Sequence, residues 1–490
     1  MSKKILLYVS ALLAACTLIT SCLGNDNNST YLYAATSSSN SLVREFKLRA
    51  DEKVLAHLDS VYFTIDPERG IIYNADSLPL GTDVSRLLVT ITFQGTIGGA
   101  AFVCTGSKLH RDTTFNYRTS ENDSVDFTGE VHLKVASYDG TFTKDYRVMV
   151  NVHKTKPDSI HWRKSYTLPL SDVKALRTAA IDDHYVTLAR TASGHVIATH
   201  NLATSQWQTK IVTLPFEPVI ESFAASDDAL YVLAVGGELY RSDDEGLTWD
   251  ATGQTWTAIV GGYDDRVLGL SHDEEGYKHV EYPAPAGFQP RAIDPNFPVS
   301  GFSQLVGAQG AWDVTSQAMM AGGRLADGTC TPSVWGYDGS NWGLLSNTLS
   351  AYQLPSIAEL ILVPYTSVTY NTTRFITEQH DVWLVMGGVN GLGMHNTGTY
   401  SSSNHGITWV NAASTQRMPI EFAELRGAQA FVVESTYDST SPKAPRRISK
   451  PVTSWSVNTI YVIGGVNAAG DLNTAVLEGV LTQFTYKPLQ

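Results

Sequence analysis

Apolar residues recur at every second position between residues 42 and 153. Val131, Leu133 and Val135 alternate with His132 and Lys134, and Tyr146 to Val152 repeats the period. Side chains of a strand point alternately to its two faces, so this pattern predicts half-buried strands. Further strands are expected in VREFKLRA, SVYFTID and RLLVTITF, and Asp139-Gly140 suits a hairpin turn. About seven short strands in about 110 residues predict an immunoglobulin-like β-sandwich over residues 42–153, followed by a linker over residues 154–159.

A longer unit repeats through residues 160–490. It consists of a polar turn, an apolar strand, a second turn and strand, and an aromatic residue that closes the unit. The copies begin DDHYVTLA (182), DDALYVLAVGG (227), DDRVLGLS (264), DVTSQAMMAGG (313), HDVWLVMGG (380) and VNTIYVIGG (457). The closing residues are Trp207, Trp249, Trp342, Trp409 and Phe484, and the third copy ends near Tyr282. Such units predict the blades of a β-propeller. The expected fold is therefore all-β, with an Ig-like β-sandwich followed by a six-bladed β-propeller.

The two ends of this repeat region complement each other. Residues 160–168, IHWRKSYTL, form a strand without a repeat of its own, and the chain ends in a strand at LTQFTY. Pairing these strands would leave no open edge in the ring. We therefore expect both ends of the region to share one blade.

Two motifs inside the repeats resemble known families. LVMGGVNGLG and YVIGGVNAAG resemble kelch blades, in which an apolar strand and Gly-Gly precede a Tyr and a Trp. Gly387-Gly388 leads to Tyr400 and Trp409 in this way, and Gly322-Gly323 leads to Tyr337 and Trp342. The layout as a whole is similar to an uncharacterised group of Bacteroidetes surface lipoproteins with a kelch-like propeller. That resemblance implies an architecture and brings no activity with it.

Residues 241–249, RSDDEGLTW, resemble the Asp box of sialidases. The motif residues are Ser242, Asp244, Gly246, Thr248 and Trp249, and a degenerate copy has Ser402, Asn404, Gly406, Thr408 and Trp409. Side-chain oxygens at the second position of either copy can accept backbone N–H groups in a tight turn, whereas an Asn cannot replace a catalytic carboxylate. The structural interpretation is therefore favoured over the catalytic one.

Other catalytic patterns are missing from the sequence. The Arg-Ile-Pro segment of sialidases is absent, and Arg177, Arg241, Arg324 and Arg426 lie outside sialidase motifs. The pairs Asp182-Asp183, Asp227-Asp228 and Asp264-Asp265 recur at equivalent repeat positions, which suits turns rather than a unique catalytic pair. There is no G-x-S-x-G and no Cys/His spacing typical of zinc. We expect neither a catalytic constellation, nor a metal, nor a cofactor.

The N-terminus predicts export. Lys3 and Lys4 precede an apolar run that ends at Ile19-Thr20-Ser21-Cys22, which resembles a bacterial lipobox. Residues 1–21 are the expected signal peptide, Cys22 the expected lipidated residue, and residues 22–41 a flexible tether to the membrane. Cys16 is the alternative lipidation site. An outer-membrane, surface-exposed lipoprotein is expected, and an inner-leaflet lipoprotein is the alternative.

Charge and two long insertions narrow the expected partners. The net charge of −13 argues against nucleic acid. Loops are expected at residues 364–381 and 435–455, before the same strand of the fifth and sixth repeats, and so on one face. Their aromatic and basic residues form the candidate rim of a ligand site: Tyr365, Tyr370, Phe375, Tyr437, Lys443, Arg446, Arg447 and Trp455.

Three functions remain open at this stage. The leading hypothesis is a non-enzymatic binding protein for a glycan or a surface protein. A divergent carbohydrate-active hydrolase and a structural envelope protein are the alternatives. Asp-Ser and Asp-Thr dipeptides at Ser60, Ser77, Thr113, Ser124, Ser159 and Ser439 also resemble O-glycosylation sites, although such dipeptides are common in turns.

Overall fold

The computed structural model describes residues 40–482, apart from residues 75, 157, 182–183, 202–205, 310–315, 347–351, 372–375 and 439–453. The chain divides into two units, the first ending at Val152 and the second beginning at His153. Cys16, Cys22 and the predicted tether lie outside the described residues. Within the described residues, no helix has the length and apolar character needed to cross a membrane.

The first unit contains a two-stranded and a six-stranded sheet. Strands β1 (Val43–Leu48) and β4 (Val89–Phe93) form the smaller one. The larger has the order β2-β3-β8-β7-β5-β6, built from β2 (Phe63–Asp66), β3 (Ile71–Asn74), β5 (Ile97–Thr105), β6 (Thr113–Asn116), β7 (Glu130–Ser137) and β8 (Thr143–Met149). The pair β3–β8 is parallel. The named strand predictions in this unit are therefore confirmed, within a few residues at their ends.

The core of the first unit follows the predicted alternation. Val131, Leu133 and Val135 on β7 are buried and alternate with more exposed residues. Phe46 of the small sheet packs against Phe63 of the large sheet, with ring centroids 4.9 Å apart. Val43 N–H donates to the buried Tyr146 hydroxyl over 3.3 Å. These contacts hold the small sheet against the large one.

The second unit is built from four-stranded sheets. In chain order among the described residues they are β10–β13 (Val173–Ile181, His184–Thr191, Gly194–Asn201, Gln206–Val212), β14–β17 (Pro218–Ala225, Leu230–Ala234, Glu238–Ser242, Asp250–Thr255), β18–β21 (Ala258–Tyr263, Arg266–Asp273, Gly276–Tyr282, Arg291–Ala292), β22–β25 (Val306–Gln309, Ser316–Ala321, Val334–Tyr337, Trp342–Leu344), β27-β28-β30-β31 (Ile361–Asn371, Ile376–Met386, Thr399–Ser402, Val410–Asn411) and β32-β33-β34-β9 (Gln429–Asp438, Ser454–Ile463, Ala475–Leu481, Ile160–Thr167). We number them sheets 1 to 6. The short strands β26 (Ile357–Ala358) and β29 (Val389–Asn390) form an extra pair.

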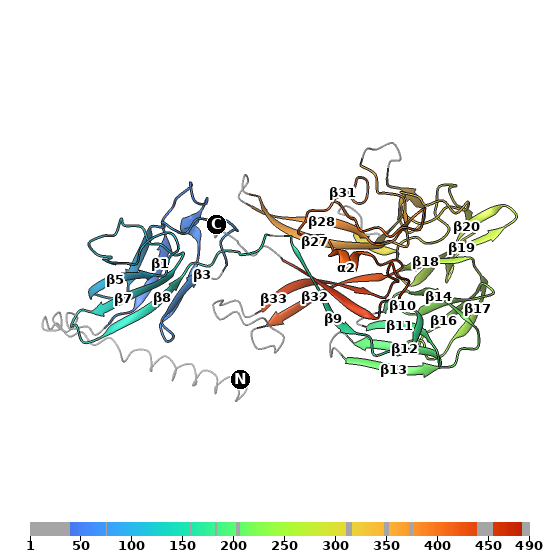
Figure 1. The fold of residues 1–490 in the computed structure, drawn as a ribbon, viewed down its shortest axis with the longest axis horizontal. Coiled ribbons are helices and arrows are strands. Elements are labelled where there is room, and N and C mark those ends of the chain that lie inside the picture. Colours follow the sequence, from blue (N-terminus) through green and yellow to red (C-terminus); the bar gives the residue numbers. More distant parts are fainter. Residues whose placement is uncertain are drawn as a thin grey trace, which may run out of the picture. The chain divides into compact units, whose positions relative to one another are not determined.

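The sheets follow one another around a ring (Figure 1). The first strand of each sheet lies innermost: β10 contacts β14, β14 contacts β18, β22 contacts β27, β27 contacts β32, and β32 contacts β10. A shared core of Val260, Tyr263, Met320 and Trp335 joins sheets 3 and 4. The ring is closed because β9, the first strand of this unit, pairs with β34 in sheet 6. The predicted pairing of the two ends is confirmed between Ile160–Thr167 and Ala475–Leu481, and residues 483–486 of the predicted last strand lie outside the described residues.

Every predicted repeat segment falls on the second strand of a sheet. These strands are β11, β15, β19, β23, β28 and β33. They are the most uniformly apolar because neighbouring sheets bury both of their faces: all five residues of β15 are buried. The innermost strands are less apolar, which explains why the repeat pattern begins one strand late.

The predicted loop over residues 364–381 is wrong. Strands β27 and β28 continue through it as a hairpin, in which Tyr365 pairs with Val382 and Tyr370 with Thr377. Val363, Tyr365 and Ser367 are buried and alternate with half-buried neighbours, a period of two that the prediction overlooked. Strands β32 and β33 form the equivalent hairpin in sheet 6, where Tyr437 pairs with Trp455. Both hairpins are drawn as long arrows in Figure 1.

Candidate functional site

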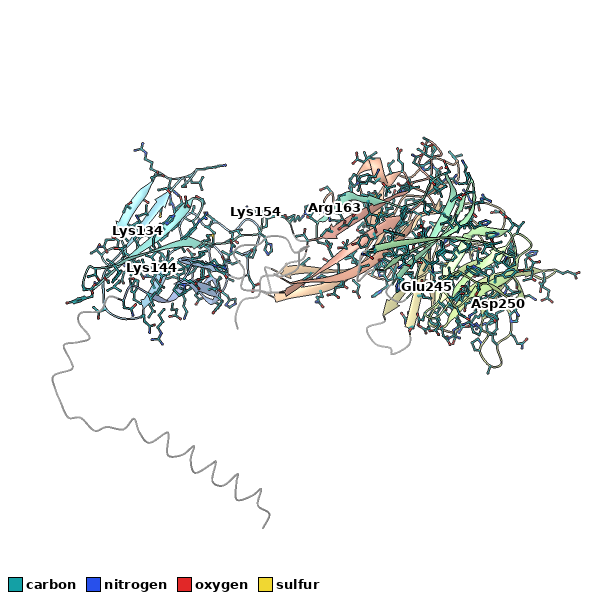
Figure 2. The ribbon with its side chains drawn as sticks, turned by 90° about the horizontal axis from the view of Figure 1, so that it is seen from below. Lys134, Lys144, Lys154, Arg163, Glu245 and Asp250 are labelled. Carbon is teal, nitrogen blue, oxygen red and sulfur yellow. The ribbon has the colours of Figure 1, made fainter. Side chains whose placement is uncertain are left out.

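The turn at Ser242–Trp249 is closed by its own side chains. Asp244 Oδ1 accepts hydrogen bonds from the Leu247 and Thr248 N–H groups over 3.0 and 2.8 Å, and its Oδ2 accepts from the Thr248 hydroxyl over 2.6 Å. Ser242 Oγ donates to Asp244 and accepts from Gly246 N–H, each over 2.9 Å. Burial alone would raise the pKa of Asp244, but these hydrogen bonds outweigh it and lower the pKa. The carboxylate is therefore fully used inside the turn. Glu245 within the turn and Asp250 just after it are labelled in Figure 2.

The turn at Ser402–Trp409 has the same geometry without a carboxylate. Asn404 Oδ1 accepts from Thr408 N–H and Ser402 Oγ, each over 3.0 Å. In both turns the tryptophan indole donates to the carbonyl three residues earlier, Gly246 over 2.9 Å and Gly406 over 3.0 Å. Because the Asn404 amide oxygen accepts from the Thr408 N–H as the Asp244 carboxylate does from the Thr248 N–H, these two turns need an oxygen acceptor rather than a titratable group.

Each of these turns packs against the preceding sheet. A Cβ built on Gly246 would lie 2.8 Å from Ile197 Cδ1 of sheet 1, and one on Gly406 would lie 2.8 Å from Val334 Cγ1 of sheet 4. Both glycines also have positive φ, 86° and 78°, which glycine adopts at least cost. Trp249 and Trp409 belong to the cores between sheets 1 and 2 and between sheets 4 and 5.

The interface between sheets 4 and 5 contains a cavity that two glycines line. Gly336 on β24 pairs with Gly343 on β25. Gly336 stands two residues after Val334, which faces the turn glycine of the next sheet. In sheet 1, the residue two after Ile197, which faces the next turn glycine in the same way, is Thr199, and it pairs with Gln208. A Cβ built on Gly343 would meet nothing within 4 Å. A Cβ built on Gly336 would lie 3.1 Å from Leu345 Cδ1, so the open space lies beside Gly343.

This space, the Gly336–Gly343 cavity, has a volume of about 260 Å³. Sheet 4 contributes Gln317, Ala318, Met319, Gly336, Tyr337, Asp338, Asn341, Trp342, Gly343 and Leu345, and sheet 5 contributes Trp383 and His405. Trp383 is 3% exposed, and its Nε1 is a buried donor without a hydrogen-bond partner among the described residues. An unmet buried donor costs about 1–3 kcal/mol, so this indole N–H is a polar group that the described residues leave unpaired beside the cavity.

Two residues of the cavity are fixed from behind by a buried network. Tyr337 donates to Glu281 Oε1 over 2.6 Å, and Trp342 Nε1 donates to His279 Nδ1 over 3.1 Å. His279 Nε2 lies 2.9 Å from the same Glu281 oxygen, and Arg266 Nη1 lies 3.2 Å from Oε2. Since Nδ1 of His279 accepts from the indole, the ring proton is on Nε2 and is donated to Glu281.

Glu281 is charged although it is buried. Burial would raise the pKa of its carboxyl, but hydrogen bonds from His279 and Tyr337 hold the pKa below its ordinary value. Burial and the neighbouring Glu281 raise the pKa of the Tyr337 hydroxyl. A Tyr–Glu pair is also what a sialidase uses as nucleophile, but Glu281 is 4% and Tyr337 1% exposed. The pair therefore stabilises the interface of sheets 3 and 4, with both carboxylate oxygens of Glu281 occupied by Tyr337, His279 and Arg266.

A Ser–His–Asp group in the first unit has the wrong connections for catalysis. Ser107 Oγ donates to Asp126 Oδ2 over 2.6 Å, and His110 Nδ1 lies 2.7 Å from the same oxygen. Ser107 Oγ also accepts from the N–H groups of Leu109 and His110, each over 3.1 Å. A nucleophilic serine would instead donate to the histidine. This group closes a turn.

The candidate ligand rim is only partly described, and one of its members is wrong. Tyr365 is 5% exposed and its hydroxyl accepts from Gln416 Nε2 over 2.9 Å, so it belongs to the core. Tyr370, Tyr437 and Trp455 lie on described strands, but their side chains are outside the described residues, as are Phe375, Lys443, Arg446 and Arg447. Ser159 is 4% exposed and donates to the Lys156 carbonyl, which does not suit a glycosylation site.

The sequence analysis did not find the Gly336–Gly343 cavity or the Glu281 network. The glycines stand seven residues apart in different strands, and Glu281 and Tyr337 come from neighbouring sheets. The one available signal was Gly336 inside an apolar strand, which can mark close approach or space for a ligand.

Solved structures with similar folds have low sequence identity to this chain. YjhT is 10% identical with a TM-score of 0.28, covering 71% of this chain and 88% of its own. YCF48 from Cyanidioschyzon merolae is 12% identical with a TM-score of 0.28, covering 65% and 98%. An oligogalacturonate lyase in complex with manganese is 11% identical with a TM-score of 0.32, covering 67% and 98%. No curated protein sequence matches the chain.

Two family models match consecutive parts of the chain. Residues 27–150 match the N-terminal domain of unknown function DUF6242. Residues 156–489, which include the closed ring of sheets, match the DUF6242 beta propeller domain. The propeller prediction is thereby confirmed, and the protein belongs to the DUF6242 family, whose two domains it carries in this order.

Proposed function

We propose that this protein is a non-enzymatic binding protein whose propeller takes one ring of a glycan into the Gly336–Gly343 cavity. The six sheets act as six kelch-like blades, and the first unit is an Ig-like spacer. Lipid at Cys22 anchors the chain to the outer membrane and presents the propeller at the cell surface. The spacing of the lipobox and the polar residues after it support this placement.

The unmet indole N–H of Trp383 carries the proposal. Trp383 lines a concave space whose rim has exposed polar side chains, Asp338, Asn341 and His405, and its Nε1 is buried without a partner among the described residues. A volume of about 260 Å³ is below that of most drug-sized pockets, which suits a single small ring. Sugar hydroxyls can accept from Trp383 and bond to the rim, while a ring face covers the glycine backbone.

The hydrolase alternative has less support. Glycosidases need two carboxyl groups about 5–10 Å apart. Among the described residues that line the cavity, Asp338 has the one carboxylate, and its Oδ1 already accepts from Ser340 N–H over 2.8 Å and from Asn341 N–H over 2.6 Å. Binding is the chemistry that this arrangement supports.

A glycan array probed with residues 40–490 tests the proposal, with reducing-end release measured in parallel. For any glycan that binds, Trp383→Phe removes the donor and keeps an aromatic ring. Trp335→Phe is the matched control: Trp335 is 4% exposed, its Nε1 is also without a partner among the described residues, and it does not line the cavity.

We expect Trp383→Phe to weaken binding about 3- to 10-fold, the value of one hydrogen bond, and Trp335→Phe to leave it unchanged. An equal loss of glycan binding in both variants would show that the binding site lies elsewhere. Release of reducing ends by the wild type would favour the hydrolase, and no binding to any glycan would favour a structural envelope protein.

A further inference from the structure

Three charged residues lie near the place where the innermost strands of sheets 4, 5 and 6 begin. Glu359 Oε2 lies 3.0 Å from Arg426 Nη1. A Cβ built on Gly301 would lie 3.6 Å from Glu359 Cγ and 3.9 Å from Arg324 Cγ, so both side chains border the same small space. Arg324, Glu359 and Arg426 together are called the Arg–Glu–Arg cluster.

Backbone hydrogen bonds bring the residues together. Glu359 N–H donates to the Gly301 carbonyl over 2.6 Å, and Gly427 N–H donates to the Glu359 carbonyl over 2.8 Å. Gly301, Glu359 and Gly427 have φ of 58°, 58° and 69° and precede β22, β27 and β32. They are equivalent positions of three consecutive sheets, joined directly to one another at one end of the ring.

At each of the three positions that Arg324, Glu359 and Arg426 occupy, the other two of sheets 4, 5 and 6 have an uncharged residue. Isolated backbone bridges pair Ser300 with Arg324 and Arg426 with Val466, and β26–β29 pairs Ala358 with Val389. In sheets 4, 5 and 6, the residue after Gly-Gly is Arg324, Val389 and Val466, respectively. In the same order, the residue before the positive-φ position is Ser300, Ala358 and Arg426. Residues that only shape a repeated turn recur in every copy. Each charged residue here occurs once: Arg324 and Glu359 border the space at Gly301, and Arg426 pairs with Glu359.

The cluster has an excess of positive charge. Arg426 is paired with Glu359, whereas Arg324 has no carboxylate partner among the described residues, and its Nη1 has the Cys330 thiol as neighbour at 3.4 Å. Glu359 and Arg426 side chains are 29% and 40% exposed, so solvent reaches them. A half-buried guanidinium without an acid partner is conspicuous on a protein with a net charge of −13.

We propose that the Arg–Glu–Arg cluster is a second ligand site, which binds an oxyanion group of a larger ligand. Arg324 makes the main contact, because the guanidinium fork matches carboxylate and phosphate oxygens. Arg426, held by Glu359, contributes the second cation. This site lies at the Gly-Gly ends of the sheets, whereas the Gly336–Gly343 cavity lies beside the turns containing Asp338 and His405.

Calorimetric titration of the full chain with glucuronate, glucose 6-phosphate and glucose tests the proposal. The first two probes differ from glucose by a carboxylate and a phosphate, so the comparison isolates the anion and identifies its kind. We expect one or both anions to bind more tightly than glucose, with an affinity that falls as salt is added.

Substitutions of neighbouring residues should act in opposite directions. Arg324→Gln should weaken anion binding about tenfold or more, the effect of losing a charge-assisted hydrogen bond. Glu359→Gln should strengthen it about 2- to 5-fold, because the competing carboxylate is neutralised. Loss of fold cannot produce a gain and a loss at adjacent positions. Trp383→Phe should change neither result.

Arg190→Gln is the control for net charge. Arg190 is the last residue but one of β11, in sheet 1, beside the turn that corresponds to the Gly-Gly turns, and it pairs with Glu217 at 3.5 Å. Anion binding should be unchanged in this variant. The proposal is overturned if neither anion binds more tightly than glucose, if Arg190→Gln weakens binding as much as Arg324→Gln, or if Glu359→Gln weakens it.

Discussion

Arg163 and Glu478 join the two ends of the propeller. Arg163 Nη2 and Nε donate to Glu478 Oε1 and Oε2 over 2.8 and 3.1 Å, although 315 residues separate them. Arg163, labelled in Figure 2, lies on β9, and Glu478 lies on β34. This bidentate pair and the strand pairing around it join the two ends of the unit within sheet 6 and so close the ring.

Deleting residues 479–490 should destabilise the propeller. The deletion removes three cross-strand partners of β9 and Leu481, which is 3% exposed in the core. Loss of a buried leucine alone costs about 2–5 kcal/mol. Urea unfolding followed by tryptophan fluorescence measures the change. A chain that ends at Thr482 keeps β34 and is the control, and equal stability of the two truncations would show that β34 does not secure the ring.

Gly246→Ala should destabilise more than Gly253→Ala. Both glycines belong to sheet 2 and have positive φ, 86° and 75°, so both substitutions strain the backbone. Only Gly246 faces a neighbour, since a Cβ there would lie 2.8 Å from Ile197, whereas one on Gly253 would meet nothing within 4 Å. The difference in the free energy of unfolding should be about 1–3 kcal/mol, the cost of overpacking. Similar losses for both would mean that the turn does not press on sheet 1.

Glu281→Ala should be among the most destabilising single changes. It leaves Arg266 without its buried acid and removes the acceptor of His279 and Tyr337. Breaking a buried ion pair in this way costs about 3–5 kcal/mol. Tyr337→Phe removes one donor and no charge, so it should cost less. A smaller loss for Glu281→Ala than for Tyr337→Phe, measured by urea unfolding, would contradict this account of the network.

Acid should destabilise the first unit through Asp126. Burial opposes ionisation, but hydrogen bonds from Ser107, Thr128 and His110 lower the pKa of Asp126 from 3.8 to about 2. A depressed pKa in the folded state stabilises above pH 3.8, and this contribution is lost as the pH falls toward about 2. Asp126→Asn should therefore show a weaker decline in stability over that range.

Two signals separate the units in this experiment. All ten tryptophans lie beyond residue 160, so tryptophan emission follows the second unit and circular dichroism follows both. The difference between wild type and Asp126→Asn should appear in thermal unfolding by circular dichroism and not in tryptophan emission. The same pH dependence in both proteins would remove Asp126 as its source.

Gly343→Val should fill the Gly336–Gly343 cavity and abolish glycan binding without loss of stability. Gly343 does not have positive φ, lies on the last strand of sheet 4, and a Cβ there meets open space. A β-branched residue is favoured in such a strand. Gly99→Val, also on a strand with nothing within 4 Å, is the control and should bind as the wild type does. Undiminished binding by a folded Gly343→Val variant would exclude the cavity.

Local patterns in the sequence were sufficient to predict the strands that are buried on both faces and the turns. The five apolar residues of β15 can pack only between two sheets, and the hydrogen bonds of Asp244 and Asn404 reach no farther than four residues along the chain. Closure of the ring was also predictable, because the extra strand at the start of the repeat region could complete the last sheet by pairing with its last strand. For the strands and turns the information lies within a few neighbouring residues, whereas the closure followed from the layout of the whole repeat region.

The position of each side chain between the sheets was decided by tertiary structure alone. The alternation around Tyr365 is compatible with a rim or a core, and only the packing of β27 against its neighbours makes it core. The Gly336–Gly343 cavity depends on the cross-strand register, and the contact of Tyr337 with Glu281 depends on how sheet 4 lies on sheet 3. Arg324, Glu359 and Arg426 meet through backbone hydrogen bonds among three sheets. Such contacts join residues tens of positions apart, and a pattern read along the chain carries no record of them.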